Sequence, residues 1–292
     1  MEKAAALYNI SLIKARKLIG RSIIFILLFI FSVAFLFPFL WMVSVSLQTE
    51  EEMLLAQGLI DQLIPKSWRF ANYPEVFKAV PFARYFLNSG IVTALALLGT
   101  LTTSTLVAYS FSRLEFPGRK VMIAIMLGTM ILPHFVFIIP LFRTYSFFGF
   151  INTYVPLVLP AFLGGGAGFI YLIMQFFKSV PQDVSDAAKI DGAGHLKIWS
   201  NIMIPLCQPV IASVAIFTFL FTWNDFLNPL IYINREDLMT VALGLNAFKG
   251  QRGIQWGYLM SASLMSMIPM LIVFIFCQRY FIEGIKMSGI KE

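Results

Sequence analysis

The segment from residue 179 to residue 206, SVPQDVSDAAKIDGAGHLKIWSNIMIPL, places an acid beside two alanines at helical spacing. At 100° per residue, one helical face carries Val184, Ala187 and Ala188. The other face carries polar residues, which are Ser185, Asp186 and Lys189. Small alanines let a second surface approach closely, and the carboxylate of Asp186 offers a charged contact. The chemistry indicated is docking to another protein.

A second acid, Asp225, lies in the run TWNDFLNPLI at residues 222–231, inside an apolar stretch. A charge inside a bilayer costs at least about 2.5–3.5 kcal/mol, so such a residue is a functional candidate. Trp223 and Asn224 beside it suit stacking on the ring of a solute and hydrogen bonding to its hydroxyl groups. The alternative is an interhelical hydrogen bond that fixes the packing of membrane helices.

Two other features are candidates for lining a solute path. Gly165 is the centre of three consecutive glycines, which could break a helix beside that path or permit a close helix crossing. His134, between Pro133 and Phe135, could line the path or form a hydrogen bond inside a helix bundle. Both alternatives remain open for each residue.

The sequence contains no motif for catalysis or for binding of nucleotide phosphates. It has no GxxxxGK[ST], HExxH or GxSxG pattern and no paired carboxylates within an apolar run. Cys207 and Cys277 form no CxxC pair and fit small core residues better than a disulfide or metal site. We therefore expect no catalytic residue, no metal ligand and no cofactor bound by this chain, so any energy source must be a partner.

The composition indicates a membrane protein. Of 292 residues, 59% are hydrophobic and only 13% are charged, against about 25% charged in soluble domains. Six stretches are long and apolar enough to cross a bilayer, which takes about 20 residues. They are 22–47, 86–111, 120–142, 153–177, 207–232 and 258–281. The first is longer than the apolar core of a cleavable signal peptide, so we expect it to be retained.

The basic residues orient these spans. Fourteen of the 22 Lys and Arg residues lie in or beside the two tails and the loops at 112–120 and 178–206, and eight lie on the other side. The positive-inside rule therefore puts both termini in the cytoplasm, whereas a nucleic-acid partner would need clustered charge. The expected parts are a tail at 1–21, a transmembrane domain at 22–281 and a tail at 282–292, with an extracytoplasmic loop at 48–85 and a cytoplasmic docking loop at 179–206.

The docking loop is predicted to form two short helices. Ser179 can cap the first, with Pro181 in its opening turn and Gln182 in capping-box position. Gly192 and Gly194 end that helix. A second helix follows, from about His195 to Pro205.

The spacing in this loop resembles a motif of membrane permease subunits of ATP-binding-cassette importers, E-A-A-x3-G-x9-I-x-L-P. The chain has Asp186-Ala187-Ala188, then Gly192 after three residues, and then Ile202, Ile204 and Pro205 after nine more. Asp replaces Glu at 186 and Ile replaces Leu at 204. An ordinary amphipathic loop helix is the alternative.

The chain looks most like maltose-type (MalG-like) permeases of carbohydrate importers. The stretches that carry this resemblance are FANYPEVFKAVPFARYFLNS, IPLF at 139–142, QFFKSVPQDVSDAAKIDGA, TWNDFLNPLI and GIKMSGIKE. It implies an all-α type I ABC importer permease fold in a bacterial or archaeal plasma membrane. It also implies as partners a second permease, two copies of an ATPase that binds ATP and Mg²⁺, and an extracytoplasmic sugar-binding protein.

The resemblance further implies which residues face these partners. The ATPase would contact the loop at Asp186, Ala187, Ala188, Lys189, Gly192, Ile202 and Pro205. The C-terminal tail, with Gly289 and Lys291, could reach between the two ATPases. The outer loop 48–85 suits contact with a binding protein or an interfacial helix.

Two other classes of function remain as alternatives. A secondary transporter or channel without a separate ATPase would need ionisable residues in several spans, where the sequence offers Asp225 and little else. A membrane enzyme would need a nucleophile, a base or a metal near one membrane face. We therefore predict that the chain is a permease subunit of an ATP-driven importer for sugars, and we expect the substrates to be oligosaccharides.

Overall fold

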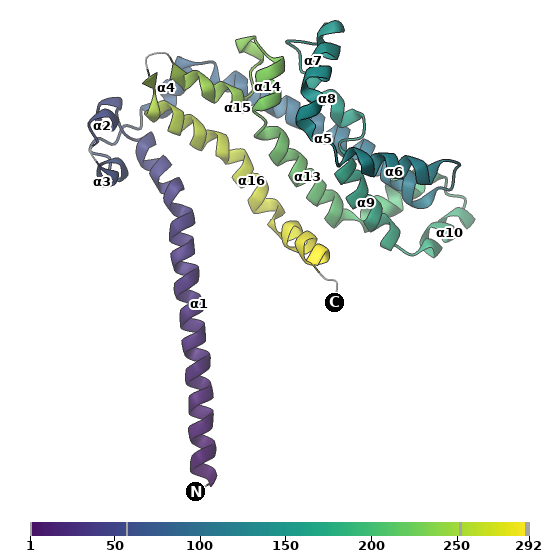
Figure 1. The fold of residues 1–292 in the computed structure, drawn as a ribbon, viewed down its shortest axis with the longest axis horizontal. Helices are drawn as coiled ribbons and strands as arrows, with labels where there is room; N and C mark the ends of the chain where they lie inside the picture. The colour runs from purple at the N-terminus through teal and green to yellow at the C-terminus, as the bar shows by residue number, and fades with distance from the viewer. Residues whose placement is uncertain (1, 57, 251–252, 290–292) are drawn as a thin grey trace. The chain divides into compact units, whose positions relative to one another are not determined.

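The computed structural model describes residues 2–56, 58–250 and 253–289, and most of them are helical (Figure 1). The chain forms two compact units, 1–76 with 250–264 and 77–249 with 265–292. Residues within each unit contact one another, whereas the parts expected from the sequence were divided by membrane topology. Each is described by itself below.

Among the residues that the structure describes, four helical segments are long and apolar enough to span a membrane. They are Ile19–Ser46, Phe82–Arg113, Val155–Ser179 and Trp256–Gln278. These coincide with the first, second, fourth and sixth predicted spans. Two bent helix pairs qualify only if each pair counts as one span, which would raise the number to six.

In the regions of the predicted third and fifth spans, the structure has interrupted helices rather than single straight ones. The third bends by 95° between Arg119–Thr129 and His134–Phe147, because Pro133 disfavours helical backbone in the residue before it. In the region of the fifth, α13 (Gln208–Trp223) ends at Asn224, and α14 (Leu227–Tyr232) is a separate helix. The α13 helix also meets the preceding segment His195–Leu206 at 84°.

The first unit contains most of the predicted outer loop. It comprises α1 (Glu2–Ser46), α2 (Glu50–Leu55), α3 (Leu59–Leu63), the start of α4 (Asn72–Ala79) and the start of α16 (Trp256–Gly289). A capping box starts α2, because Thr49 Oγ1 accepts from the backbone N–H of Glu52 while the Glu52 carboxylate accepts from that of Thr49. The buried amide of Asn72 donates to the carbonyls of Ser46 and Gln48, at 2.8 and 2.9 Å. These bonds hold the outer loop against the end of α1.

The second unit is built around α5 (Phe82–Arg113). Three helices pack on it: α8 (Val155–Phe162), α9 (Ala167–Ser179) and α13. The other elements of this unit are α6 (Arg119–Thr129), η1 (His134–Phe137), α7 (Ile138–Phe147), α10 (Gln182–Ile190), α11 (His195–Ile198), η2 (Trp199–Met203), α12 (Ile204–Leu206), α14, η3 (Glu236–Leu238), α15 (Val241–Gly244) and η4 (Leu245–Phe248). The short strand β1 (Lys249–Gly250) lies at the boundary of the two units, and β2 (Gly253–Ile254) belongs to the first unit.

The triple glycine both breaks a helix and allows a close crossing, so the two predicted alternatives occur together. Gly164, Gly165 and Gly166 all have positive φ and separate α8 from α9. A Cβ on Gly165 would lie 2.9 Å from the Cα of Thr100 on α5. Near the end of α8, the carbonyl of Ala161 accepts a 2.9 Å hydrogen bond from Thr103 Oγ1 on α5.

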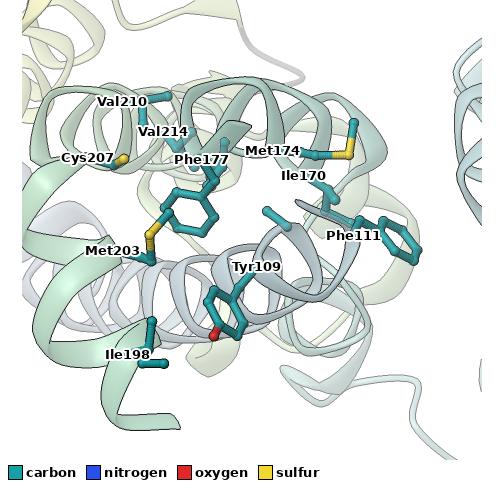
Figure 2. Close-up of a cluster of buried hydrophobic side chains, with 12 residues drawn as sticks. Tyr109, Phe111, Ile170, Met174, Phe177, Ile198, Met203, Cys207, Val210 and Val214 are labelled. Atoms are coloured by element: carbon teal, nitrogen blue, oxygen red, sulfur yellow. The ribbon is translucent and has the colours of Figure 1, made fainter. Parts of the chain in front are cut away.

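One buried cluster joins α5, α9 and α13 to the predicted docking loop. Its members are Ala108, Tyr109, Phe111, Ile170, Ile173, Met174, Phe177, Ile198, Met203, Cys207, Val210 and Val214. Figure 2 shows Met203 directed toward the ring of Phe177. Cys207 is therefore a core residue, as predicted, whereas Cys277 is half-buried. The cluster fixes the docking loop to the membrane helices by hydrophobic packing.

Candidate docking site

The docking site is built on α10, which begins without the predicted cap. No side chain caps its first turn, and Pro181 occupies the N-cap position. Ser179 belongs to the end of α9, where its hydroxyl donates a 2.8 Å hydrogen bond to the carbonyl of Phe176. The predicted Ser179 cap is thus wrong, because α9 continues two residues further than expected and uses that hydroxyl for itself.

The end of α10 follows the prediction at Gly192. This residue has φ +78°, its N–H donates to the carbonyl of Lys189, and the N–H of Ala193 donates to that of Ala188 at 2.9 Å. This pair of bonds is a Schellman motif, which closes a helix and reverses the chain. Gly194 has φ −70°, so it starts the next helix with ordinary extended backbone.

The second predicted helix is present and is built into the core. The segment His195–Leu206 contains α11, the π-helical turn η2 and α12. Ile198 and Met203 within it are fully buried, and Ile202 packs on the same cluster. The ring nitrogen Nδ1 of His195 lies 3.2 Å from the hydroxyl of Tyr109 on α5. This half of the loop is an anchor rather than a free surface.

Arg113, the last residue of α5, holds the start of α10 in place. Its Nη2 donates 2.6 Å hydrogen bonds to the carbonyls of Phe177 and Val180, and its Nη1 donates at 2.6 Å to the side chain of Gln182. The guanidinium fork suits several acceptors at once. The sequence analysis counted Arg113 only as a topogenic charge, since nothing in its local sequence indicates partners 64–69 residues away.

The faces of α10 differ from the predicted assignment at Ser185. Ser185 is 1% exposed and lies on the inner side of the helix with the half-buried Ala188. The outer side is apolar: Ala187 is exposed, and Val184 and Ile190 are 37% and 88% exposed. A short serine fits against the membrane helices, which leaves the larger aliphatic chains outside. Val184, Ala187 and Ile190 follow one another at three-residue spacing on α10 and form a small apolar surface, called here the docking surface.

A single ion pair borders the docking surface. The Asp186 carboxylate accepts a 2.9 Å hydrogen bond from Lys189 Nζ, and both side chains are largely exposed. This bond lowers the pKa of the Asp186 carboxyl from its ordinary value. The carboxylate is therefore charged at neutral pH and accessible to a basic group of a partner. Pro205 of the predicted set is exposed as well.

The candidates near residue 225 make mainly local contacts. Trp223 is buried, and its Nε1 donates to the carbonyl of Ser266 at 3.0 Å. The carboxylate of Asp225 accepts from the backbone N–H of Asn228 at 3.1 Å and from its side-chain amide at 2.8 Å. These bonds start α14 after the break in the predicted fifth span. The side chain of Asn224 is exposed and donates to the carbonyl of Leu220.

The remaining candidates are spread along the chain. His134 is exposed at the start of η1, directly after the 95° bend. Gly165 lies at the crossing with α5. Gly289 is the last described residue of α16, and Lys291 lies outside the described residues. Within the described part of the chain, no group of three or more His, Cys, Asp or Glu side chains could hold a metal ion.

The family of the chain follows from comparison with known proteins. Residues 100–287 match the model of the family described as "Binding-protein-dependent transport system inner membrane component". The chain belongs to this family. The matched region includes the whole docking loop, the crossing at Gly165 and the break at Asp225.

Similar proteins are transport permeases from several organisms. The chain is 34% identical to the diacetylchitobiose uptake system permease NgcG of Streptomyces coelicolor, over 87% of this chain and 83% of that protein. It is 33% identical to the trehalose/maltose transport system permease MalG of Thermococcus litoralis, over 88% and 91%. The predicted resemblance to sugar-importer permeases is therefore confirmed.

The fold is also that of a known transporter chain. A chain of a bacterial ABC transporter that imports the acidic polysaccharide alginate matches with a TM-score of 0.78 and 23% identity. The match covers 88% of this chain and 94% of that one. The predicted ABC importer permease fold is confirmed, and the chain is a multi-pass membrane component of a transport system.

Proposed function

We propose that this chain forms half of the translocation path of an ATP-driven importer for oligosaccharides and related sugars. The observation that carries the proposal is an exposed apolar docking surface on α10 that is locked to the membrane helices. The sugar specificity is supported by relatives named for diacetylchitobiose and for trehalose and maltose. The chain itself supplies membrane helices and a coupling element, and hydrolysis occurs on a separate ATPase subunit.

The coupling step starts at the docking surface. An ATPase cleft receives Ala187 and Ile190, and a basic group of the ATPase pairs with Asp186. The rest of the predicted contact set, Ala188, Lys189, Gly192, Ile202 and Pro205, shapes or borders this surface. Because Arg113 and the core cluster tie the loop to α5, α9 and α13, closure of the ATPases would move the loop and these helices together.

The partners of the chain follow from the same mechanism. A second permease subunit completes the path, and two ATPase copies bind ATP and Mg²⁺ and drive its alternation between inward-open and outward-open states. An extracytoplasmic solute-binding protein delivers the sugar. The complex resides in a bacterial or archaeal plasma membrane, with the docking loop and both termini in the cytoplasm and the tail at Gly289 and Lys291 reaching the ATPases.

The solute path runs past the helix breaks of the second unit. Asp225 and Asn224 stand at the break between α13 and α14, with Trp223 supporting them from its buried position. Gly165 marks the corresponding break between α8 and α9, and His134 stands at the bend before α7. Interrupted helices expose backbone polar groups, which are tolerated in a membrane where they line a cavity.

Reconstitution tests this proposal. The importer complex that contains the chain would be purified, placed in vesicles and supplied with its binding protein and a labelled oligosaccharide. We expect uptake only when ATP is present on the side of the docking loop and binding protein on the other side. Uptake driven by an ion gradient without ATP would overturn the proposal in favour of a secondary transporter.

A further inference from the structure

A basic pocket lies beside the docking site, between the end of α9 and the start of α6. Its volume is about 610 Å³, and its lining includes the cationic side chains of Arg119, Lys120 and Lys178. Phe116 and Val121 supply apolar wall, and Glu115 is the one carboxylate in the lining. The pocket belongs entirely to the second unit.

The cations of this pocket are available for an anion. Within the residues that the structure describes, none of Arg119, Lys120 and Lys178 forms an ion pair with a carboxylate. Arg119 is oriented by one hydrogen bond, 3.0 Å from its Nη1 to the carbonyl of Leu114. Lys120 and Lys178 are exposed. Three cations against one carboxylate give the pocket a net positive charge.

The pocket lies at the ends of two helical segments that are long and apolar enough to span a membrane, Phe82–Arg113 and Val155–Ser179. Its lining residues come from the connection after α5, the start of α6 and the end of α9. Figure 1 shows these segments near α10, and Arg113 at the end of α5 donates a hydrogen bond to Gln182 at the start of α10. The distribution of Lys and Arg makes these helix ends cytoplasmic. Directly next to the pocket, α6 exposes aliphatic side chains, with Val121 and Ile125 62% and 64% exposed. Charge and an apolar stripe are therefore continuous along one helix.

We propose that this pocket binds the phosphate of an anionic phospholipid headgroup from the cytoplasmic leaflet. The phosphate would lie among Arg119, Lys120 and Lys178, and an acyl chain would run along Val121 and Ile125. A soluble anion would leave the aliphatic stripe unused, whereas a lipid matches both the charge and the apolar surface. The lipid would bridge the α5–α6 connection and the end of α9, beside the coupling loop.

Native mass spectrometry of the full chain, purified in detergent and titrated with phosphatidylglycerol or phosphatidylcholine, tests this inference. We expect tighter binding of phosphatidylglycerol, and a fall in its affinity on the order of fivefold for each charge removed by Lys120→Gln and Lys178→Gln. Lys66→Gln, which removes an exposed lysine outside the pocket, is the matched control and should leave binding unchanged. Thermal unfolding identifies any variant that has lost its fold.

Two further arms separate the possible ligands. Inorganic phosphate should not displace phosphatidylglycerol at equal concentration, and displacement would show a site for a free anion rather than a lipid. Equal binding of the two lipids, or equal affinity in native and doubly substituted folded chains, would overturn the inference. If the double variant loses a co-purifying ATPase while lipid binding persists, the pocket is a protein contact and the lipid assignment is wrong.

Discussion

The side chains of the docking site fall into two groups. One group holds the loop on the membrane helices, and the other is exposed and could contact a partner. Arg113, Tyr109 and Ser185 face inward and fix the loop on the helices. Ala187, Ile190 and Asp186 face outward and have few contacts within the chain. The motif spacing in the sequence pointed to Asp186 and Ala187 but not to Ile190. It missed Arg113, because the carbonyls that this residue binds become neighbours only when α5 and α9 have packed.

Replacing Arg113 tests its holding role. We expect Arg113→Ala to lower the free energy of unfolding by about 1.5–3 kcal/mol, the range for hydrogen bonds to a charged group. Arg113→Lys should lie in between, since one ammonium cannot reach all three acceptors in the same geometry. Thermal unfolding and ATPase activity stimulated by the binding protein are the measurements. Arg143→Ala, at an exposed arginine of α7, is the control, and an equal effect there would contradict the assigned role.

The pH dependence of α10 tests the ion pair of Asp186. The hydrogen bond from Lys189 lowers the pKa of the Asp186 carboxyl below its ordinary value of 3.8, so the stabilisation is complete above that value and is lost as pH falls through the lower pKa of the folded chain. We expect hydrogen-exchange protection factors of α10 to stay constant from neutral pH to about pH 5 and to fall below 3.8. The difference between native chain and Asp186→Asn isolates this carboxyl. No difference at low pH would contradict the pair.

At the scale of elements, helix breaks proved harder to predict than helices. Apolar length predicted the four long spans within a few residues, because bilayer thickness fixes that length. Gly192 was predicted to end a helix, and a break was one of the two alternatives given for the triple glycine, because positive φ favours glycine. At Asp225 the sequence indicates a charge inside a span, whereas the structure has a break between two helices. A short polar segment between two helices and a single charge in one long helix have the same appearance in an apolar sequence. The 95° bend at Pro133 was missed because a proline in a membrane helix is compatible with a straight span.

Two glycines two residues apart give a matched test of the loop. Gly192→Ser forces a side chain into φ +78° and should cost about 1–2 kcal/mol. Gly194 has φ −70°, and nothing lies within 4 Å of the Cβ that a serine would add there. Because the serine hydroxyl would also cap α11, Gly194→Ser should be neutral or stabilising. Thermal unfolding of the two variants checks this contrast. Equal destabilisation would mean that Gly192 does not close α10 as described.

At the scale of the whole molecule, the chain is a membrane component whose functional surfaces lie outside its own core. Apolar side chains of α1, α6 and α16 are widely exposed, as expected for helices that contact lipid or a second permease. The chain has neither a catalytic motif nor a nucleotide-binding loop in its sequence. In the proposed function the chain transmits movement from a partner ATPase, and the docking surface is the part of the chain that would receive it.

Affinity of the ATPase for the purified permease complex tests this central claim most directly. Ile190 is 88% exposed and outside the core cluster, so Ile190→Asp should leave the fold intact. Leu54→Asp, at a leucine of α2 in the other unit that is 84% exposed, is the control. The account predicts at least about a tenfold loss of ATPase affinity, 1.4 kcal/mol, for Ile190→Asp and none for Leu54→Asp. Unchanged affinity in the folded Ile190→Asp complex would contradict it.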